Sequence, residues 1–343
     1  MRRPKLTQYL TGQDSRVANT FLSPVSHPKL PFKAAPGQLS AAEINVKRYF
    51  NGAVRSQKFF IFGKPVAHSR SPGLHNTLFK ENGLPHEYGR IETDDVAELK
   101  ETLFADGFGG ASITIPLKLD IMKYLDEVSE EADIIGAVNT IVVDRSRSGI
   151  DHYGHRLIGR NTDWLGMRKV LENAGARVSP DTSALVIGGG GTARAAIFTL
   201  HKIGYSPIYV LGRSASRLRA LVQSFDQEYN LYILTTLEAA SHMSPPAVAV
   251  GTIPADKPVD PDMEKVLNKI LTGQSGNAKS TKRVLLEMAY KPAVTPLMEL
   301  AQSADWVTVP GLEVLAAQGL YQFEAWTGIK PLFTRARDIV LGG

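Results

Sequence analysis

From residue 58 onward, short apolar runs alternate with stretches in which apolar residues recur every three or four positions. Runs such as 59–62 and 184–187 are uniformly apolar, which is typical of strands covered on both faces. The predicted strands are residues 59–62, 86–91, 110–115, 137–143, 184–187 and 207–211. The predicted helices are residues 72–82, 96–104, 117–125, 127–134, 163–174, 192–200 and 313–326, the last ending at Gly328. This alternation predicts an α/β fold with mostly parallel sheets.

The first 56 residues do not follow this pattern. Proline-rich loops at 22–28 and 33–38 precede a predicted helix over residues 41–50, for which Ser40 is the expected N-cap. So short and proline-rich a segment buries little surface, and we expect no independent core there. Two later polar segments are predicted to be irregular. They are a turn between hairpin-like strands at 146–156 and a disordered insertion at 273–282.

A glycine cluster joins a short apolar run to a helix-favouring run, giving the sequence VIGGGGTAR over residues 186–194. A strand, a tight glycine turn and a helix in this order predict the opening of a Rossmann-like dinucleotide-binding unit. Gly188 can make the turn, Gly190 allows the backbone to approach a pyrophosphate, and Gly191 allows close packing. Free N–H groups at the start of the helix, around Thr192, would face the phosphates. The alternative is a plain flexible turn.

The strand at 207–211 is followed by the sequence GRSASR, where NAD-dependent enzymes place an acidic residue that binds the ribose 2′-hydroxyl. No carboxylate is present in this segment. Arg213, Ser214 and Arg217 are instead suited to a 2′-phosphate, through bidentate guanidinium contacts and a hydroxyl donor. The sequence therefore predicts NADP(H) rather than NAD(H) as the cofactor. The alternative is that Ser214 caps the next helix and both arginines are solvated.

Composition limits the remaining possibilities. At 343 residues the chain is long enough for two domains, and 43% hydrophobic and 21% charged residues are ordinary for a globular protein. It has no cysteine, and its eight histidines show no metal-binding spacing, so we expect no metal. No apolar run reaches the roughly 18 residues of a membrane span, and no apolar signal region follows the basic start, so a cytoplasmic protein is expected. The net charge of +5 is spread along the chain and gives no nucleic-acid-binding signature.

Polar side chains follow several predicted strands of the first half, where open α/β sheets bind ligands. Serine, threonine, asparagine and glutamine together would form a neutral hydrogen-bonding pocket suited to a polyhydroxylated acid. Ser69 and Ser71 lie at the start of a predicted helix, whose N-terminus would help them to bind a carboxylate. The candidate residues of this pocket are Ser69, Ser71, Thr114, Lys118, Asn139, Asp163 and Gln318.

Lys118 and Asp163 are the candidate acid–base pair. An ammonium stabilises the charge that develops on a ketone oxygen during hydride transfer, and it can supply a proton. A carboxylate beside it would hold the lysine in place and bind a neighbouring hydroxyl. From the residues alone, two plainer interpretations remain open. Lys118 would be a solvated surface lysine, and Asp163 would cap a helix.

Six segments of the chain, in order, resemble the motifs of shikimate dehydrogenases. They are HSRSP at 68–72, TIPLK at 114–118, GAVNT at 136–140, NTD at 161–163, GGGG at 188–191 and GLEVLAAQ at 311–318. The likeness covers about residues 58–343. The family reduces 3-dehydroshikimate to shikimate with NADPH, reversibly, in the biosynthesis of aromatic amino acids.

The resemblance implies roles for individual residues. Lys118 and Asp163 would be the catalytic pair. Tyr290, in the sequence AYKP, would line the substrate pocket, and Gly311 would lie beside the nicotinamide. The residues that would hold the substrate carboxylate and hydroxyls are Ser69, Ser71, Thr114, Asn139 and Gln318.

The resemblance also implies a division into domains. An open, mostly parallel substrate-binding sheet is expected over residues 57–162, joined by helices from 314–343, and a Rossmann-like NADP-binding domain over residues 163–313. The first 45 residues resemble the last strands of a type I 3-dehydroquinate dehydratase, on the evidence of Ser15-Arg16 and the sequence APGQ at 35–38. In that family such an arginine and glutamine touch the substrate.

That dehydratase family places its Schiff-base lysine and catalytic histidine upstream of the matching segment, so dehydratase activity is not expected. The order of the two parts resembles the C-terminal end of the fungal pentafunctional arom polypeptide. Residues 1–56 would then be a dehydratase remnant with a linker. Other arom domains, or a second copy of the chain, are the protein partners that this resemblance leaves open, beside the small-molecule substrate.

Three positions depart from the family's usual pattern. Arg160 replaces an aspartate before NTD, GRS at 212–214 replaces NRT, and GTIPA at 251–255 replaces an Asn-Ala-Thr-like turn near the nicotinamide. Two rival functions stay open. One is a quinate/shikimate dehydrogenase of catabolism that uses NAD, and the other is a non-catalytic, metabolite-sensing domain of a quinate-pathway repressor. Retention of both Lys118 and Asp163 argues against the sensor, which needs the pocket but not the acid–base pair.

Overall fold

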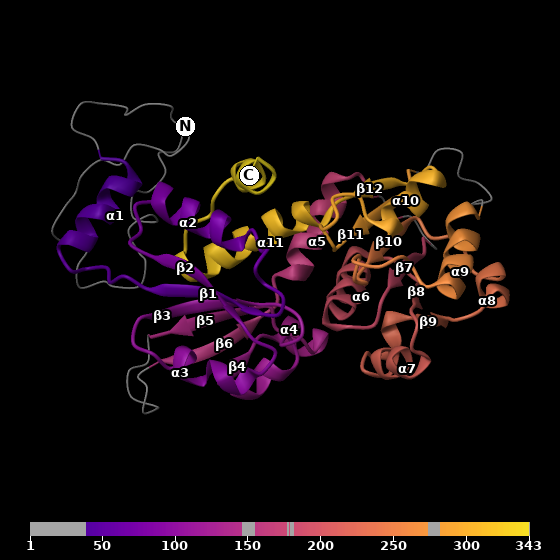
Figure 1. Cartoon of the computed structure of the whole chain (residues 1–343), viewed down its shortest axis with the longest axis horizontal. Helices are drawn as coiled ribbons and strands as arrows, with labels where there is room; N and C mark the ends of the chain where they lie inside the picture. Colours follow the sequence, from indigo (N-terminus) through magenta and orange to yellow (C-terminus); the bar gives the residue numbers. More distant parts are fainter. Residues whose placement is uncertain (1–38, 146–154, 177, 179–181, 274–281, 343) are drawn as a thin grey trace, which may run out of the picture.

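The computed structural model describes residues 39–145, 155–176, 178, 182–273 and 282–342. The proline-rich loops predicted before Ser40 and most of the polar segments predicted at 146–156 and 273–282 lie outside the described residues. Figure 1 shows two α/β units side by side along the long axis of the molecule, each built on its own sheet, which confirms the predicted fold class. We call the parts built on the two sheets the first and the second domain.

Helix α1 (Ala41–Phe50) begins where the sequence predicts it. Ser40 Oγ accepts a hydrogen bond from Glu43 N at 3.2 Å, and Ser40 N donates to Glu43 Oε2 at 2.7 Å, which together form a capping box. No residue of α1 is fully buried. The helix is held against the end of α2 (Ser71–Glu81), where Asn45 donates to the Asn82 carbonyl at 2.9 Å.

The first sheet has six strands in the order β2-β1-β3-β5-β6-β4. Their bounds are β1 Lys58–Gly63, β2 Glu87–Glu92, β3 Phe108–Ile113, β4 Glu127–Val128, β5 Thr140–Asp144 and β6 Arg156–Arg160. Strand β5 runs antiparallel to both β3 and β6, and the other neighbouring pairs are parallel. As a result β1, β3 and β6 end at one edge of the sheet, and the chain enters β5 from that same edge.

Different helices cover the two faces of the first sheet. They are α2 Ser71–Glu81, α11 Gly311–Thr327 and α12 Phe333–Leu341 on one face, and η2 Val96–Leu99, α3 Lys100–Leu103 and η3 Asp120–Tyr124 on the other. Phe59 packs in the cluster with Phe323 of α11 on the first face, whereas Phe62 packs with Leu103 on the second. Because both faces are covered, every residue of β3 is buried.

Three predicted helices of the first domain differ from the observed elements. The stretch 96–104 is a 3₁₀ helix followed by one short α turn, and the stretch 117–125 contains only the 3₁₀ helix η3. The stretch 127–134 begins with strand β4, and α4 (Glu130–Ile135) follows it. Here β4 pairs with residues 158–159 of β6, so pairing across the chain outweighs the local helical preference.

The second sheet has six parallel strands in the order β12-β11-β10-β7-β8-β9. The strands are β7 Ala184–Ile187, β8 Ile208–Leu211, β9 Leu231–Leu234, β10 Val248–Gly251, β11 Val284–Glu287 and β12 Val307–Val309. The helices are α6 Gly191–Ile203, α7 Ala215–Gln223, η4 Gln227–Tyr229, α8 Leu237–Ser241, α9 Pro261–Thr272 and α10 Pro296–Ser303. The strand order reverses at β7, and ligands of doubly wound sheets bind beyond the strand ends at such a reversal. This topology confirms the predicted Rossmann-like fold.

Helices α5 (Asp163–Asn173) and α11 pack against each other between the two sheets (Figure 1). A Cβ at Gly166 would lie 2.9 Å from the backbone N of Gln318, so only glycine permits this approach. Helix α12 is tied to the loop before α2, because Arg70 donates to the Val340 carbonyl at 2.7 Å. The described helices include none whose length and apolarity would let it span a lipid bilayer.

Candidate functional site

Lys118 and Asp163 are in direct contact at the C-terminal edge of the first sheet. Lys118 follows β3, Asp163 follows β6, and Lys118 Nζ lies 2.6 Å from Asp163 Oδ2. Their side chains are only 12% and 10% exposed. Lys118 is therefore not a solvated surface lysine. A shielded ion pair of this kind keeps a fixed geometry when further hydrogen bonds satisfy both groups.

Asp163 is the first residue of α5, but another side chain caps this helix. Asn161 Oδ1 accepts a hydrogen bond from Asp163 N at 3.0 Å and lies 3.4 Å from Trp164 N, which also donates to it. Asn161 thus supplies the oxygen that the plainer interpretation assigned to Asp163. The Asp163 carboxylate is left to bind Lys118.

Asn139 holds the second oxygen of Asp163. Asn139 Nδ2 donates to Asp163 Oδ1 at 2.8 Å and lies 3.0 Å from Thr162 Oγ1 and 3.3 Å from Gln318 Oε1. Asn139 Oδ1 in turn accepts from Thr162 N at 2.7 Å. The residues before Thr140, predicted as part of a strand, instead form the connection that places Asn139. Lys118, Asp163, Asn139 and Gln318 thus belong to one hydrogen-bonded cluster.

A buried polar network, which the sequence did not predict, continues from this cluster toward α2. Gln322 Nε2 donates to Thr140 Oγ1 at 3.0 Å, and Gln322 Oε1 accepts from Ser112 Oγ at 2.9 Å. Ser112 Oγ also accepts from Tyr88 Oη at 2.6 Å. Gln322 follows Gln318 by four residues, so the two side chains share one face of α11, and this spacing could have indicated Gln322. Ser112 and Tyr88 carry no comparable signal.

Ser69 and Ser71 lie on the loop that leads into α2, and both are buried. Ser71 is the first residue of the helix, and its backbone N donates to Ser69 Oγ at 3.3 Å. Arg90 donates to the Ser69 carbonyl at 2.8 Å and so fixes the loop. Thr114, directly after β3, is partly buried and its carbonyl accepts from Leu117 N.

Tyr290 approaches the first domain from the second. It follows β11, and its ring packs against the buried cluster that contains Phe59 and Phe323. Burial raises the pKa of Tyr290, and the positive charge of Arg70 acts in the opposite direction. Because Arg70 stands between Ser69 and Ser71 in the chain, Tyr290 lies near the loop that carries both serines.

The glycine loop between β7 and α6 leaves space for an anionic ligand. Gly188 has φ +133°, and a Cβ there would collide with Thr252 Oγ1, so this turn requires glycine. A Cβ at Gly190 would meet no atom within 4 Å, and no side chain caps α6, which begins after Gly190. Open space above an uncapped helix N-terminus fits a pyrophosphate. Gly191 and Thr192 face the first domain instead, where Thr192 Oγ1 lies 3.3 Å from Lys118 Nζ.

Arg213, Ser214 and Arg217 lie beyond the end of β8, next to the glycine loop. Ser214 is the N-cap of α7 and accepts from Arg217 N, so the capping role considered as an alternative is present. The cap does not use the guanidinium groups. Arg213 and Arg217 are exposed, and neither forms an ion pair with another described residue. Two unpaired positive charges at this strand end fit a phosphate group.

Gly311 marks the start of α11 beside the end of β11. A Cβ there would collide with the Met288 carbonyl oxygen and lie 2.9 Å from that of Glu287, so the helix starts directly on the strand end. Burial raises the pKa of Glu287 to about 7. Its carboxylate accepts hydrogen bonds at 3.0 Å from Ala289 N and from Thr295 Oγ1. These bonds hold both ends of the loop that carries Tyr290.

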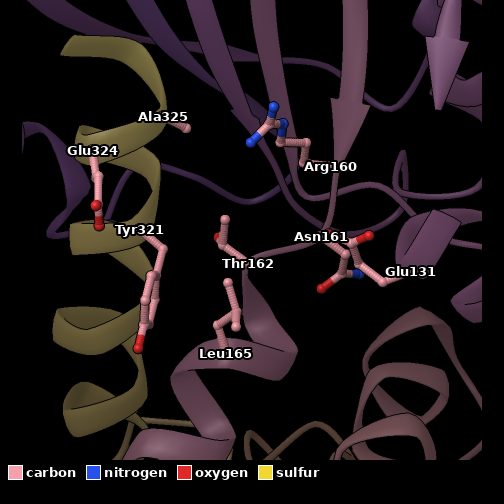
Figure 2. Close-up of a pocket in the computed structure, with 8 residues that line it drawn as sticks. All are labelled: Glu131, Arg160, Asn161, Thr162, Leu165, Tyr321, Glu324 and Ala325. Atoms are coloured by element: carbon pink, nitrogen blue, oxygen red, sulfur yellow. The ribbon is translucent and has the colours of Figure 1, made fainter. Parts of the chain in front are cut away.

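A cavity of about 370 Å³ lies beside this site, next to the start of α5. Its lining residues are Glu131, Arg160, Asn161, Thr162, Leu165, Tyr321, Glu324 and Ala325. Figure 2 shows the Arg160 side chain directed from the end of β6 toward α11. The cavity shares Thr162 with the polar cluster, but neither Lys118 nor Asp163 lines it. Across the described residues, no group of three or more acidic, histidine or cysteine side chains could hold a metal ion.

Family models match three parts of the chain. The substrate-binding domain of shikimate dehydrogenase matches residues 61–141, and the C-terminal domain of shikimate 5′-dehydrogenase matches residues 311–341. Type I 3-dehydroquinase matches residues 10–52. The matches at 61–141 and 311–341 contain most of the hydrogen-bonded cluster around Lys118.

Solved structures are similar over most of the chain. The dehydroquinate dehydratase and shikimate dehydrogenase part of S. pombe AroM is 42% identical with a TM-score of 0.73, and the alignment covers 93% of this chain and 59% of that one. The Thermus thermophilus shikimate 5-dehydrogenase in complex with NADP(H) and shikimate is 28% identical with a TM-score of 0.66, covering 83% and 99%. The Aquifex aeolicus shikimate dehydrogenase is 28% identical with a TM-score of 0.67, covering 83% and 97%. This chain thus spans about three fifths of the S. pombe chain and nearly all of the two bacterial ones.

Proposed function

We propose that this chain, which belongs to the shikimate dehydrogenase family, catalyses the reversible NADPH-dependent reduction of 3-dehydroshikimate to shikimate. The observation that carries the proposal is the shielded Lys118–Asp163 pair, held by Asn139 at the C-terminal edge of the first sheet. The T. thermophilus relative has been solved with NADP(H) and shikimate bound, which supports the same ligands here.

Lys118 is the acid in the direction of reduction. Its ammonium donates a hydrogen bond to the ketone oxygen, stabilises the negative charge that develops there, and transfers a proton to it. Asp163 Oδ2 fixes the direction of the ammonium, and Asp163 can accept a hydrogen bond from a neighbouring substrate hydroxyl. In the oxidation of shikimate, Lys118 takes the proton back from the hydroxyl.

The remaining polar residues of the first domain bind the substrate. Ser69 and Ser71, with the N-terminus of α2, hold the carboxylate, because hydroxyl donors and the positive end of the helix favour an anion. Tyr290 closes the pocket from the second domain. The residues that hold the substrate hydroxyls are Thr114, Asn139 and Gln318.

The second domain fits NADP(H), and its residues would hold the pyrophosphate bridge and the 2′-phosphate of the cofactor. When bound, the cofactor supplies the hydride. The pyrophosphate would lie over Gly188, Gly190 and the uncapped start of α6, with Gly191 and Thr192 beside it. The side chains that would bind the 2′-phosphate are those of Arg213, Ser214 and Arg217. Gly311, at the start of α11, would lie beside the nicotinamide.

The test is the change in nicotinamide absorbance when the purified chain is mixed with shikimate and NADP⁺. We expect turnover that falls about 10²–10⁴-fold in Lys118→Met. Lys123→Met is the matched control, because Lys123 is an exposed lysine of the same segment, and it should keep wild-type activity. Turnover with quinate and NAD⁺ but not with shikimate and NADP⁺ would favour the catabolic enzyme. Binding of shikimate by folded protein without turnover would contradict the enzyme and favour a metabolite sensor.

We propose that this chain functions fused to a dehydroquinase domain in one polypeptide, because residues 10–52 match the type I 3-dehydroquinase model. The S. pombe relative carries both activities in its name. The mass of the native polypeptide in its source cells, measured with an antibody against the first domain, tests this fusion.

A further inference from the structure

The first turn of α6 belongs to the second domain by sequence, but it packs against the first. A Cβ at Gly191 would lie 3.1 Å from Leu119 Cδ1, 3.5 Å from Lys118 Cβ and 3.6 Å from Ala137 Cβ. Ala137 is fully buried in the same apolar cluster as Ala193 of α6. The glycine that opens α6 therefore permits close contact between domains as well as within the nucleotide-binding unit.

The next residue reaches the proposed acid. Lys118 Nζ lies 3.3 Å from Thr192 Oγ1 in addition to 2.6 Å from Asp163 Oδ2. A lysine ammonium has three N–H groups and no acceptor. With one N–H directed to the carboxylate and one to the hydroxyl, the direction of the third is fixed by tetrahedral geometry. That third N–H is the one available for a substrate oxygen.

Arg194, two residues further along, anchors this turn. Its Nη1 donates to the Ile135 carbonyl at 3.1 Å, at the C-terminal end of α4 in the first domain. Its guanidinium also lies 5.9 Å from the centre of the Phe225 ring in the second domain. Gly136 has φ +66°, and a Cβ there would lie 2.9 Å from Arg194 Nη1, so the helix end leaves space for the guanidinium. Arg194 is partly buried, and this burial lowers the pKa of its guanidinium.

We propose that the first turn of α6 positions Lys118 for proton transfer, with Thr192 as the second hydrogen-bond partner of its ammonium and Arg194 as the anchor to α4. The inference rests on the proposed function, because it takes Lys118 as the acid. It adds a task to the glycine-loop helix, which then orients the catalytic lysine of the other domain besides facing the cofactor. Thr192 and Arg194 are positioning residues in this scheme.

A role of Thr192 in orienting Lys118 and a role in binding the cofactor predict different changes in kcat and in NADP⁺ affinity. Removing its hydroxyl in Thr192→Val should lower kcat about 5–10-fold, the value of one lost hydrogen bond to a charged group, and Thr192→Ser should restore kcat to within twofold of wild type. The dissociation constant of NADP⁺, measured by calorimetry without substrate, should change less than kcat. If Thr192→Val weakens NADP⁺ binding and leaves kcat unchanged, Thr192 is only a cofactor ligand and the proposal is wrong.

Arg194 is tested without turnover, by hydrogen exchange of the cofactor-free protein. In Arg194→Met the amides of residues 133–137, which are hydrogen-bonded within α4 and at its C-terminal end, should exchange at least about tenfold faster. Lys202→Met is the matched control, because Lys202 lies on the same helix over the Phe198 ring, 5.3 Å away, and should leave these amides unchanged. Arg194→Gln, whose shorter side chain keeps two of the five N–H donors, replaces the methionine variant if that variant does not fold.

The two measurements keep the two proposals distinguishable. Absence of turnover in the wild-type protein contradicts the proposed function, whereas the exchange experiment still reports the anchor. Unchanged exchange at 133–137 in both Arg194 variants would overturn the anchoring role even in an active enzyme.

Discussion

Asn139 donates from Nδ2 to Asp163 Oδ1 at 2.8 Å while Lys118 binds the opposite oxygen of the same carboxylate. The carboxylate is thus held on both sides, and its plane cannot rotate without breaking one of the two bonds. Asparagine suits this position because its amide donates to one carboxylate and cannot repel it.

Asn139→Asp tests this arrangement with an almost isosteric change. Two carboxylates at hydrogen-bond distance cannot both be ionised, so the pair would share a proton and Asp163 would hold Lys118 less firmly. We expect kcat for shikimate oxidation to fall at least about tenfold. Asn173→Asp, an exposed change of the same charge at the other end of α5, should leave kcat within twofold. Equal activity of both variants would remove Asn139 from the proposed machinery.

Arg213→Ala tests cofactor preference. Loss of one charge-assisted contact to the 2′-phosphate should raise the KM for NADP⁺ about 10–100-fold and leave the KM for NAD⁺ nearly unchanged. Steady-state kinetics with each cofactor measure both values. Arg219→Ala on the exposed side of α7 is the control. An unchanged KM for NADP⁺ in Arg213→Ala would show that Arg213 does not bind the 2′-phosphate.

Gly311→Ala tests the close start of α11. The added methyl group would meet two backbone carbonyl oxygens, which cannot move as a flexible side chain would. We expect a loss of about 1–3 kcal/mol in the free energy of unfolding, measured in urea, together with weaker activity. Gly73→Ala is the contrasting control: it lies in α2, a Cβ there meets no atom within 4 Å, and alanine should stabilise the helix by about 0.5–1 kcal/mol. An unchanged free energy of unfolding in Gly311→Ala would mean that α11 can move away from the end of β11 at little cost.

Glu287 should make stability depend on pH. Its folded pKa of about 7 lies above the model-peptide value of 4.5, so between these values the folded protein keeps a proton that the unfolded chain has lost. This contribution to stability is fully present below pH 4.5 and is lost as pH rises through 7. The Glu287→Gln variant has no ionisable group at this position. Between pH 4.5 and pH 8, the free energy of unfolding of the variant should therefore rise by on the order of 3 kcal/mol relative to that of the wild type.

Chemical unfolding of both proteins at pH 4.5, 6 and 8 measures this trend. A constant difference between Glu287→Gln and wild type over the series would contradict the buried, titrating carboxyl. The sign of the change matters more than its size, because a surface carboxylate with a lowered pKa would give the opposite slope.

The sequence predicted the elements whose identity depends on local pattern. The apolar run 184–187 is strand β7, and Gly328 ends α11 in the left-handed conformation that glycine adopts most easily. It mispredicted elements decided by distant partners. Residues 127–128 were predicted to be helical, because no neighbouring residue in the sequence indicates that they pair with β6.

The candidate site shows the same division. Lys118, Asn139 and Asp163 could be selected because polar residues after strands of one sheet meet at one edge. Gln322 was missed although its spacing from Gln318 could have indicated it, and Ser112 and Tyr88 carry no such pattern, since Ser112 bonds to a residue 210 positions away. The cap by Asn161 was also missed, because the motif NTD offers two other oxygen-bearing side chains for the same task.

The buried cluster that joins Phe59 and Leu74 to Phe323, Ala336 and Val340 has a consequence for synthesis on the ribosome. Residues of the first sheet emerge early, but the helices that cover one of their faces emerge only after the whole second sheet. The second domain, whose strands are continuous in the chain, can fold while the first still exposes an aromatic face. Stalled translation before residue 311 should therefore yield a nascent chain with one folded domain and one that chaperones recognise.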